Sequence, residues 1–302
     1  MVSILQRPTA VTTRRGFLSA AALSALALSS CGQPPLAIAD LSGSPPEPAP
    51  PTRTPSPPTS VGDLGSYRTP PPEATSLPGR APTAWGTHLS GIHTSVPTQA
   101  DHPTLALTFD ACGGPNGSAV DHHLLGVLRD AAIPATLFLN EWWIRSNPAM
   151  TEELASDPLF RLENHGTLHV PLSVTGRRAY SIVGTSSPDG VAEEIESNRR
   201  HLLDSVGVHS RWFRSGTAHY DDIAVDIAHS LGVQLAGFTV NADAGATATS
   251  TTVAQQLLNA PDGAIVLAHM NQPSSGTSAG VRAGLAPLRD RGTQFVHLST
   301  QL

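Results

Sequence analysis

The sequence predicts an α/β fold: a small, incomplete (β/α) barrel preceded by a disordered linker. From about residue 98 onward, short strand-like runs alternate with segments whose apolar residues recur at helical spacing. Before that point the composition differs, because 15 of the 27 prolines fall between Pro34 and Pro82. Alternating strands and helices are typical of a parallel sheet with right-handed crossovers, and about seven such units in about 200 residues suit a small barrel.

The expected elements follow one another in a regular order. Thr104–Asp110 is a strand-like run, and after a turn rich in Gly, Pro, Asn and Ser, Val120–Ala132 is apolar at helical spacing. The long helix expected over Gly190–Val206 carries glutamates early and arginines later, as the helix dipole favours. The remaining strands are Pro134–Asn140, Leu159–Glu163, Arg211–Arg214, Gln234–Asn241, Ala264–His269 and Gln294–Leu298, and the remaining helices are Met150–Ser156, Asp221–Leu231, Thr252–Asn259 and Ala279–Arg291.

Composition excludes several functions. The 302 residues carry a formal net charge of −6, and all 18 basic residues are arginines because the chain contains no lysine. A Schiff-base lysine, a pyridoxal-phosphate lysine and a P-loop lysine are therefore excluded. The acidic balance also argues against a nucleic-acid partner, since nucleic-acid binding depends on clustered Lys and Arg.

Residues 1–31 have the anatomy of an export signal. Arg14 and Arg15 precede Phe17 and an apolar stretch that runs to Leu28, which is too short to span a bilayer. The paired arginines resemble a twin-arginine signal, whose pathway exports proteins that are already folded.

The end of this signal resembles the lipobox of bacterial lipoproteins, in which the cysteine, here Cys31, is acylated and becomes the mature N-terminus. Lipid on Cys31 would anchor the protein to the outer face of the bacterial cell membrane and would be its only membrane contact. The alternative is an ordinary cleaved signal with a chance cysteine, which would leave the protein secreted. Residues 32–98 are rich in Pro, Ser and Thr, so we expect a disordered spacer before the domain at 99–302. No obligate protein partner is evident.

Polar side chains collect at the carboxyl ends of the expected strands, where α/β folds place their chemistry. Five successive ends each deliver a titratable or hydrogen-bonding group, and three histidines and two aspartates are among them. Chance accounts for two or three such groups but poorly for five. In chain order the groups are Asp110, Asn164 and His165 with His169, Arg214, Asn241 with Asp243, and His269.

His165 and His169 are separated by three residues, which places two imidazoles near each other, as zinc, cobalt and nickel sites use. Histidines at this spacing also occur on exposed turns without a metal. Asp110 at a neighbouring strand end favours the metal interpretation.

These residues lie in motifs that resemble those of polysaccharide deacetylases, the NodB-homology enzymes of carbohydrate esterase family 4. The matching segments are, in order, Leu107–Asp110, His165–His169, Arg214 at a strand end and Leu267–His269, and the resemblance covers about residues 99–302. It implies a distorted (β/α)7 barrel that removes N- or O-acetyl groups from polysaccharides such as peptidoglycan or chitin. It also implies a divalent metal, with zinc expected and cobalt or nickel as alternatives.

The resemblance further implies a role for each strand-end residue. Asp110 is the general base that takes a proton from water, and His269 is the general acid that delivers a proton to the leaving amine. Arg214 orients Asp110 and keeps it ionised. Asp243, or Asn241, steadies the histidine or the arginine from the next strand.

The metal-binding motif departs from the family pattern. The family usually has a second aspartate, a metal ligand, directly after the first, but here that position is Ala111. Either Asp110 itself ligates the metal beside His165 and His169, or the ion keeps the two histidines and water, or a nearby group substitutes. Cys112 is one candidate because thiolates bind zinc well, and the alternative is a small buried residue in a tight turn.

Two further segments leave alternatives open. The arginine motif, usually Arg-Pro-Pro-Tyr-Gly, here runs over Arg214–Tyr220, which could reshape the substrate groove and bring His219 into the site. Glu141–Trp143 follows the second strand at the same end of the fold, where its tryptophans could wall a sugar ring or pack in the core.

We therefore expect an exported, metal-dependent polysaccharide N-deacetylase, a hydrolase of linear amides acting on a carbon–nitrogen bond other than a peptide bond. One alternative is a hydrolase of a smaller amide substrate, with or without a metal. Another is a catalytically weak barrel that binds glycan as a surface lipoprotein, with Ala111 marking the loss. The presence of Asp110, Arg214 and His269 argues against this last alternative.

Overall fold

The computed structural model describes residues 80–298. The expected export signal, the lipid site at Cys31 and residues 32–79 of the expected linker lie outside the described residues. Among the described helices, none is both long and apolar enough to cross a bilayer.

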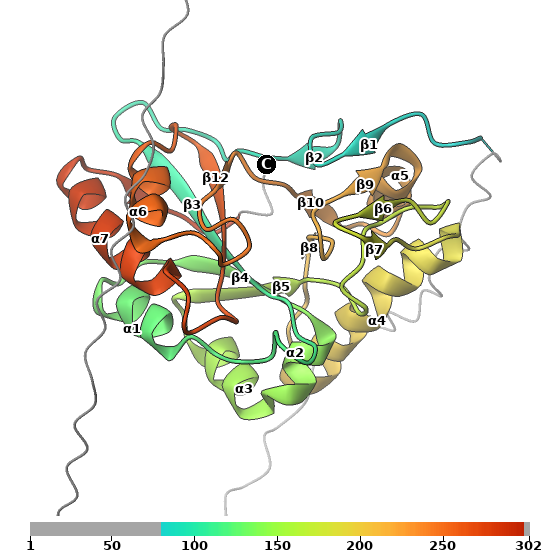
Figure 1. Ribbon diagram of the computed structural model, residues 1–302, viewed down its shortest axis with the longest axis horizontal. Helices are drawn as coiled ribbons and strands as arrows, with labels where there is room; N and C mark the ends of the chain where they lie inside the picture. Colours follow the sequence, from blue (N-terminus) through green and yellow to red (C-terminus); the bar gives the residue numbers. More distant parts are fainter. Residues whose placement is uncertain (1–79, 299–302) are drawn as a thin grey trace, which may run out of the picture. The chain divides into compact units, whose positions relative to one another are not determined.

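Within residues 80–298, nine strands form one sheet in which every neighbouring pair is parallel (Figure 1). The order is β11-β12-β3-β4-β5-β8-β10-β2, and β13 pairs with the start of β3. This curled parallel sheet with helices confirms the predicted α/β fold. Its strands are β2 (Ile92–His93), β3 (Thr104–Ala111), β4 (Ala135–Leu139), β5 (Phe160–Asn164), β8 (Trp212–Phe213), β10 (Gln234–Ala236), β11 (Val240–Asn241), β12 (Ala264–His269) and β13 (Gln294–Phe295).

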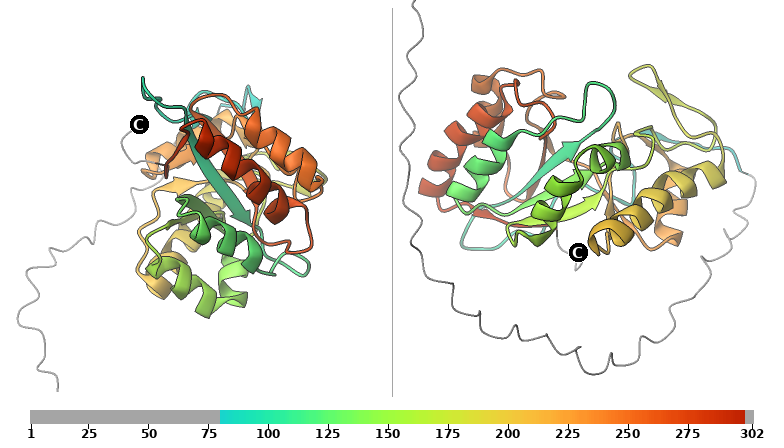
Figure 2. Two further views of the ribbon diagram at one scale, coloured as in Figure 1. Left: turned by 90° about the vertical axis from the view of Figure 1, so that its left-hand side faces the viewer. Right: turned by 90° about the horizontal axis from the view of Figure 1, so that it is seen from below.

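Helices cover the outer side of the sheet (Figure 1; Figure 2, left). α6 and α7 pack together beside β12 and β3, α1 to α3 follow along the next strands, and α4 and α5 lie toward β8 and β10. Most of these helices begin where a polar side chain accepts a hydrogen bond from a free backbone N–H, as at Asp121, Asn140, Ser187, Asp221 and Thr249. The helices are α1 (His122–Asp130), α2 (Glu141–Ser146), α3 (Pro148–Ser156), α4 (Pro188–Val206), α5 (Asp222–Ser230), α6 (Ser250–Leu258) and α7 (Thr277–Asp290).

The side chains of strand β3 alternate between the two faces of the sheet. All 8 of its residues are buried, as expected for a central strand covered on both sides. Its odd-numbered residues, up to Ala111, pack in the core under the helices, whereas Ala106 belongs to a second cluster inside the barrel, with Trp212. Because side chains alternate along a strand, Thr108 and Asp110 follow Ala106 onto the inner face. The sheet therefore presents Asp110 to the barrel interior at its carboxyl end.

The boundary of the linker at residue 98 is wrong. β1 (Trp85–Gly86) pairs with β9 (Tyr220–Asp221), and β2 pairs with β10. Ser95 then bridges to Ala264 at the start of β12, so this segment joins β10 to β12 on the open side of the barrel. Strands of two residues show no hydrophobic periodicity. The prediction therefore depended on composition alone, and it assigned β1 and β2 to the linker.

The expected strand Gln234–Asn241 is interrupted. β10 ends at Ala236 and pairs with β8 and β2, whereas β11 pairs with β12. The interruption occurs where the carbonyls of Ala236 and Gly237 accept hydrogen bonds from the Arg214 side chain. A side chain remote in the sequence therefore ends the strand, which local propensity does not reveal.

A hairpin replaces part of the loop expected after the third strand. β6 (Arg178–Ala179) and β7 (Ile182–Val183) are antiparallel and joined by Tyr180 and Ser181. Both joining residues have positive φ angles, 48° and 68°, as a two-residue type I′ turn requires. The sequence lacks the Asn-Gly or Asp-Gly pair that usually announces such a turn.

Candidate active site

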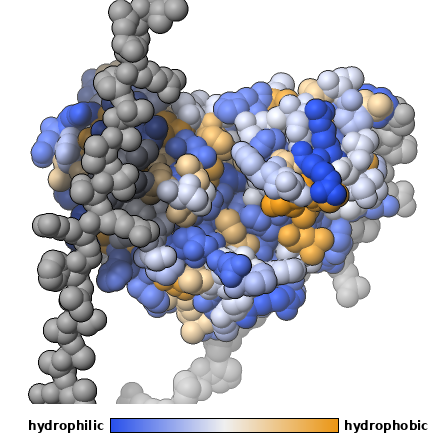
Figure 3. Space-filling model, viewed as in Figure 1, coloured by the Kyte–Doolittle hydropathy of each residue, from blue (hydrophilic) through white to orange (hydrophobic). Residues whose placement is uncertain are grey.

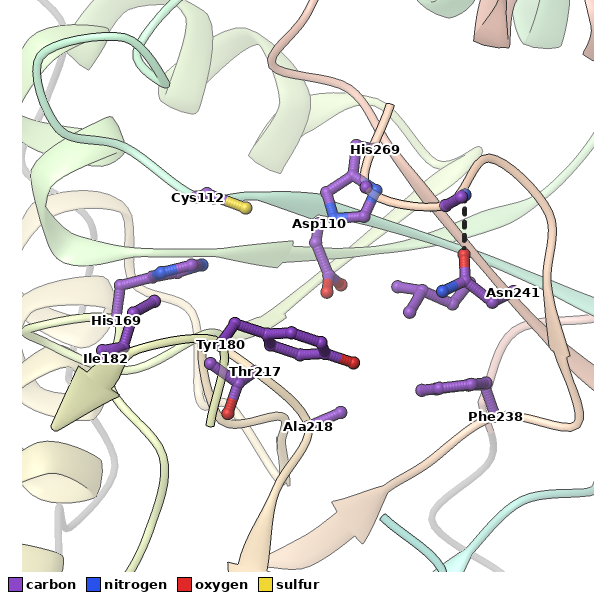
Figure 4. A pocket seen from close by; sticks show the side chains of 14 residues that line it. Asp110, Cys112, His169, Tyr180, Ile182, Thr217, Ala218, Phe238, Asn241 and His269 are labelled. Carbon is purple, nitrogen blue, oxygen red and sulfur yellow. Dashed lines mark hydrogen bonds between the residues drawn. The ribbon is translucent and has the colours of Figure 1, made fainter. Parts of the chain in front are cut away.

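The carboxyl ends of the parallel strands surround a pocket of about 440 Å³ (Figure 4). The end of β3 supplies Asp110 and Cys112, the loop after β5 supplies His169, and the ends of β11 and β12 supply Asn241 and His269. In Figure 4 the thiol of Cys112, the carboxylate of Asp110 and the ring of His269 face the same space. The structure thus brings together residues that the sequence singled out at separate strand ends.

Asp110 is an ionised carboxylate held by a buried arginine. Its Oδ1 accepts a hydrogen bond from Arg214 Nη1 at 2.8 Å, and both side chains are buried. Burial alone would raise the pKa of Asp110, but the charge of Arg214 and the neighbouring His165 and His269 outweigh burial and lower it. Asp110 is therefore suited to accept a proton.

Arg214 is fixed by contacts on every side of its guanidinium. It donates to Thr108 Oγ1 at 2.9 Å and to the carbonyls of Ala236 and Gly237 at 3.2 and 2.9 Å. The guanidinium also lies over the ring of Phe138, 4.3 Å from its centroid. This planar set of donors holds the charge directly beside Asp110, and a lysine could not reproduce it.

The backbone carbonyl of Arg214 decides which nitrogen of the neutral His165 ring carries the proton. A carbonyl can only accept, so Nδ1, 2.9 Å away, donates and Nε2 keeps its lone pair. This Nε2 faces two acidic groups, with Asp110 Oδ2 at 3.5 Å and Cys112 Sγ at 3.9 Å. Burial would lower the pKa of His165, but these two groups raise it. These two groups therefore favour a cation at Nε2, either a proton or a bound metal ion.

His169 lies on the same loop as His165, and their ring centroids are 4.8 Å apart with the planes nearly perpendicular. Its Nε2 is buried and has no hydrogen-bond partner in the part of the chain that the structure describes. Gly216 allows the close packing here, because a Cβ at that position would lie 2.3 Å from the carbonyl carbon of His169. A buried nitrogen without a partner is unfavourable, and a bound ligand would remove that cost.

Cys112, rather than Asp110, completes the group of candidate metal ligands. Ligand atoms of Cys112, His165 and His169 all lie within 4.8 Å of one another. One thiolate and two imidazoles form a donor set that zinc accepts, so the residues present fit the metal that the family resemblance implies. Asp110 lies beside this group, with one oxygen toward His165 and the other on Arg214.

Glu194 of α4 holds the loop that carries both histidines. Its Oε2 and Oε1 accept hydrogen bonds from the backbone N–H groups of Leu168 and Val170, at 2.8 and 3.4 Å. Burial raises the pKa of Glu194 to about 7, although these N–H donors oppose the shift. Sequence reasoning missed this role because it assigned Glu194 to the helix dipole. The available signal was its place on the buried stripe of α4, between Val191 and Ile195.

His269 faces the pocket and is held from behind by Asp243. Nδ1 of His269 lies 2.9 Å from Asp243 Oδ1, while Oδ2 accepts from the His269 backbone N–H and the Thr277 hydroxyl. Burial would lower the pKa of His269, but Asp243 and the nearby Cys112 raise it well above its usual value. These contacts favour the protonated ring, in which Nε2 can donate.

Two alternatives that the sequence left open concern Asn241 and His219. Asn241 lines the pocket, but its Oδ1 accepts from a backbone N–H of the following turn at 2.9 Å (dashed line in Figure 4) and not from the histidine or arginine. His219 lies beside the pocket, with its ring centroid 5.7 Å from Trp85 and 5.3 Å from Tyr180. The residues that line the pocket from this motif are those at 216–218.

The exposed aromatic side chain of Tyr180 lines the pocket, whereas Trp142 and Trp143 do not. Tyr180, at the tip of the β6–β7 hairpin, is 79% exposed and lines the pocket. The hairpin projects on the same side as the loop after β3 (Figure 2, right), and hydrophobic and strongly hydrophilic side chains adjoin there (Figure 3). The two tryptophans of Glu141–Trp143 differ: Trp143 is buried, with Nε1 donating to the Ala119 carbonyl, and Trp142 is 48% exposed.

Part of the chain is similar to a known protein family. Residues 98–236 match a family model described as polysaccharide deacetylase. A curated relative, the uncharacterized protein YlxY of Bacillus subtilis (strain 168), is 24% identical over 195 residues. That match covers 64% of this chain, and the chain spans 55% of the length of the relative.

Solved structures share the fold at low sequence identity. PdaA of Bacillus subtilis, a family 4 carbohydrate esterase, is 18% identical with a TM-score of 0.57, over 69% of this chain and 83% of that one. A family 4 carbohydrate esterase from Streptomyces lividans, in complex with acetate, is 21% identical with a TM-score of 0.55, over 66% and 94%. A family 4 pseudoenzyme from Bacillus anthracis is 20% identical with a TM-score of 0.55, over 66% and 65%.

Proposed function

Because the chain carries a NodB-homology domain of carbohydrate esterase family 4, a family of hydrolases that act on N-acetyl amide bonds, we propose that it is an exported, metal-dependent deacetylase of amino-sugar polysaccharide. Peptidoglycan is the substrate we favour, since the chain begins with the anatomy of an export signal. The observation that carries the proposal is the arrangement of a base, Asp110, and an acid, His269, around one pocket beside two histidines.

The chain's own residues supply the proton transfers. Asp110, kept ionised by Arg214, takes a proton from the attacking water as the water oxygen bonds to the acetyl carbon. His269, protonated and oriented by Asp243, gives a proton to the amine nitrogen as the carbon–nitrogen bond breaks. The products are acetate and a free amine.

The two histidines hold the metal in this proposal. His165 offers Nε2, because its Nδ1 donates to a carbonyl, and His169 lies next to it with a buried, unpaired nitrogen among the described residues. When a divalent ion such as zinc, cobalt or nickel is bound, the chemistry that it supplies is polarisation of the acetyl carbonyl and activation of water.

The location outside the cell is also a proposal. The twin-arginine pattern at Arg14 and Arg15 and the lipobox-like cysteine at Cys31 support export and anchoring by lipid. The lipid would be the only membrane contact, and secretion without lipid is the alternative. The partners that follow are a polysaccharide substrate and no nucleic acid.

A second candidate function is glycan binding with weak catalysis. The likeness to a family 4 pseudoenzyme and the alanine at position 111 favour it. A mutant of that pseudoenzyme is described as having restored enzymatic activity. The ion pair of Asp110 with Arg214 and the place of His269 on the same pocket favour the enzyme here.

The test is acetate release by the purified chain from N-acetylglucosamine oligomers, from peptidoglycan and from small N-acetyl amides. We expect release from the polymers that a chelator abolishes and added zinc restores. The matched control is Asp226→Asn, a change of an exposed carboxylate on α5, which should leave the rate unchanged. Glycan binding without acetate release would support the second function, and release from small amides alone would support a smaller-substrate hydrolase.

A further inference from the structure

We propose that the thiolate of Cys112 is the third protein ligand of a Cys–His–His metal centre, in place of the aspartate that the family resemblance puts at position 111. The inference rests on the proposed function only for the location of the site. Metal binding can be measured without turnover, so the metal centre and the proposed function can fail separately.

The end of strand β3 brings Cys112, and not Ala111, to the two histidines. Ala111 is fully buried in the core under the helices, together with Leu107 and Phe109 of the same strand. Asp110 and Cys112 flank it and line the pocket. In this chain Ala111 ends the strand on the core side, and Cys112, the first residue after the strand, presents its thiol to His165.

The distances agree with a shared ion. Sγ of Cys112 lies 3.9 Å from Nε2 of His165, and the ligand atoms of the three residues lie within 4.8 Å of one another. Bond lengths of about 2.3 Å for zinc–sulfur and about 2.0–2.1 Å for zinc–nitrogen give a sulfur–nitrogen separation of about 3.6 Å at a tetrahedral angle. A shift of a few tenths of an ångström closes the difference for Cys112 and His165, and a pair at the 4.8 Å limit has to close by about 1 Å.

The surrounding structure holds the three side chains in place before any metal binds. The carbonyl of Arg214 fixes the tautomer of His165 that leaves Nε2 free, and Glu194 holds the backbone of the histidine loop. The turn after Cys112 depends on Gly113, whose φ is +74° and where a Cβ would lie 2.7 Å from the backbone nitrogen of Trp143. Such support beyond the ligands is typical of metal sites.

A thiolate in this position has two consequences. It favours zinc and cobalt over magnesium, calcium and manganese, which prefer oxygen ligands. It also leaves Asp110 outside the set of ligands, paired with Arg214 and available as a base. The chain thereby separates metal binding from proton transfer, although it lacks the usual second aspartate.

The experiment is a titration of the metal-free full chain with cobalt, followed by absorption. Cobalt bound to a thiolate has a charge-transfer band in the near ultraviolet, so we expect the band in the wild type and its loss in Cys112→Ser. We also expect at least about a 100-fold loss of zinc affinity in that variant. The matched control is Cys31→Ser at the chain's other cysteine, which should keep both the band and the affinity.

A second measurement does not depend on the folding of a variant. Zinc should slow the alkylation of Cys112 by iodoacetamide in the wild type, and a chelator should restore the rate. Equal alkylation rates with and without zinc, or a cobalt complex without the thiolate band, would overturn the inference. If the band is present but no acetate is released from any substrate, the proposed function fails and the metal centre stands. If acetate release depends on a metal but the band is absent, the proposed function stands and Cys112 is not a ligand.

Discussion

At the scale of single residues, Asp110 is placed to act either as a catalytic base or as a metal ligand. One of its oxygens accepts from Arg214 and the other lies 3.5 Å from His165, so either role is sterically open to it. The arginine favours the role of a base, because it keeps the carboxylate ionised and occupies one oxygen. Substitutions that separate turnover from metal content can decide between the two roles.

The first prediction compares Asp110→Asn with His165→Ala. Asparagine keeps an oxygen for Arg214 but cannot take a proton, so we expect full metal content and a loss of about 10²–10⁴-fold in the rate of acetate release. His165→Ala removes a ligand, so we expect the metal itself to be lost. Metal analysis and acetate release on the same preparations test both. Weaker metal binding in Asp110→Asn would make Asp110 a ligand after all.

The second prediction concerns Ala111→Asp, the substitution that restores the usual family residue. Its carboxylate would enter the apolar core under the helices, where an unpaired charge costs several kcal/mol. We expect a lower thermal midpoint and no gain in zinc affinity. Ala111→Asn, of the same shape but without charge, is the control for volume and should be less destabilising. Tighter zinc binding in Ala111→Asp would show that the side chain can turn into the pocket.

The candidate site was predictable from the sequence wherever a residue ended a recognisable strand. Asp110 and His269 follow apolar runs, and the strand-end rule placed them together correctly. The relation of Asp243 to His269 was also expected. The position of Cys112 was left open, because its reach depends on where β3 ends, and a strand boundary is the least certain feature of a sequence pattern.

At the scale of elements, α4 supports the histidine loop through its buried face. Glu194 and Asn198 lie on the same side of the helix as Val191 and Leu202. Asn198 donates to the Leu139 carbonyl while Glu194 accepts from the loop. Polar groups on a buried helical face are unfavourable unless paired, so each such pair marks a position where the helix secures another segment.

The third prediction is a dependence of stability on pH that Glu194 causes. Burial raises its folded-state pKa to about 7, against 4.5 in the unfolded chain. Between these values the folded chain keeps a proton that the unfolded chain has lost. The free energy of unfolding should therefore fall by about 3 kcal/mol as pH rises through this window, being highest below the unfolded value.

Glu194→Gln isolates this effect, because glutamine does not titrate and every other group is shared. Urea unfolding of both proteins between about pH 5 and pH 8, with a chelator present in each sample, gives the difference in their free energies of unfolding. We expect that difference to change by about 2.5 kcal/mol across the range, because pH 5 already lies inside the window. Parallel pH profiles for the two proteins would mean that Glu194 has an ordinary pKa in the fold.

Elements with a strong pattern were predicted well, and short elements were not. Ala264–His269 has the bounds expected from the sequence, and the helix expected over Gly190–Val206 differs from α4 only in its first two residues. The hairpin of β6 and β7 and the strands of two residues escaped prediction. Such elements are defined by their pairing with distant residues, and no local periodicity encodes that pairing.

At the scale of the whole molecule, the fourth prediction concerns anchoring. Cys31→Ser should move the protein from membranes to the aqueous phase, because acylation requires the thiol. Phase partitioning of the protein expressed with its own signal measures this change. Replacing Arg14 and Arg15 together by lysine should instead leave folded precursor in the cytoplasm. A wild-type protein already in the aqueous phase would exclude the lipid anchor.

The fifth prediction concerns where the folded unit begins. The Pro-rich composition placed its start at 99, whereas Arg80 binds Asp222 and Asp226 on α5, and Val96 is buried in the inner cluster. A chain of residues 99–302 lacks the segment that joins β10 to β12, together with the buried Val96, worth about 1.5–3 kcal/mol, and the partly buried Leu89 and Ile92. It also exposes two strand edges, which favours aggregation.

Chains of residues 80–302 and 99–302 should therefore differ clearly in stability. With about 2–4 °C of thermal midpoint per kcal/mol in a domain of this size, we expect the shorter chain to unfold about 10 °C lower. Calorimetry and gel filtration compare the two, and a chain of residues 64–302 should match the first. Equal midpoints for all three would mean that β1 and β2 pair without contributing to stability. The pairing of residues 92–96 with β10 and β12 would then add nothing to the free energy of unfolding. The stable folded unit would begin at residue 99, as the composition predicts.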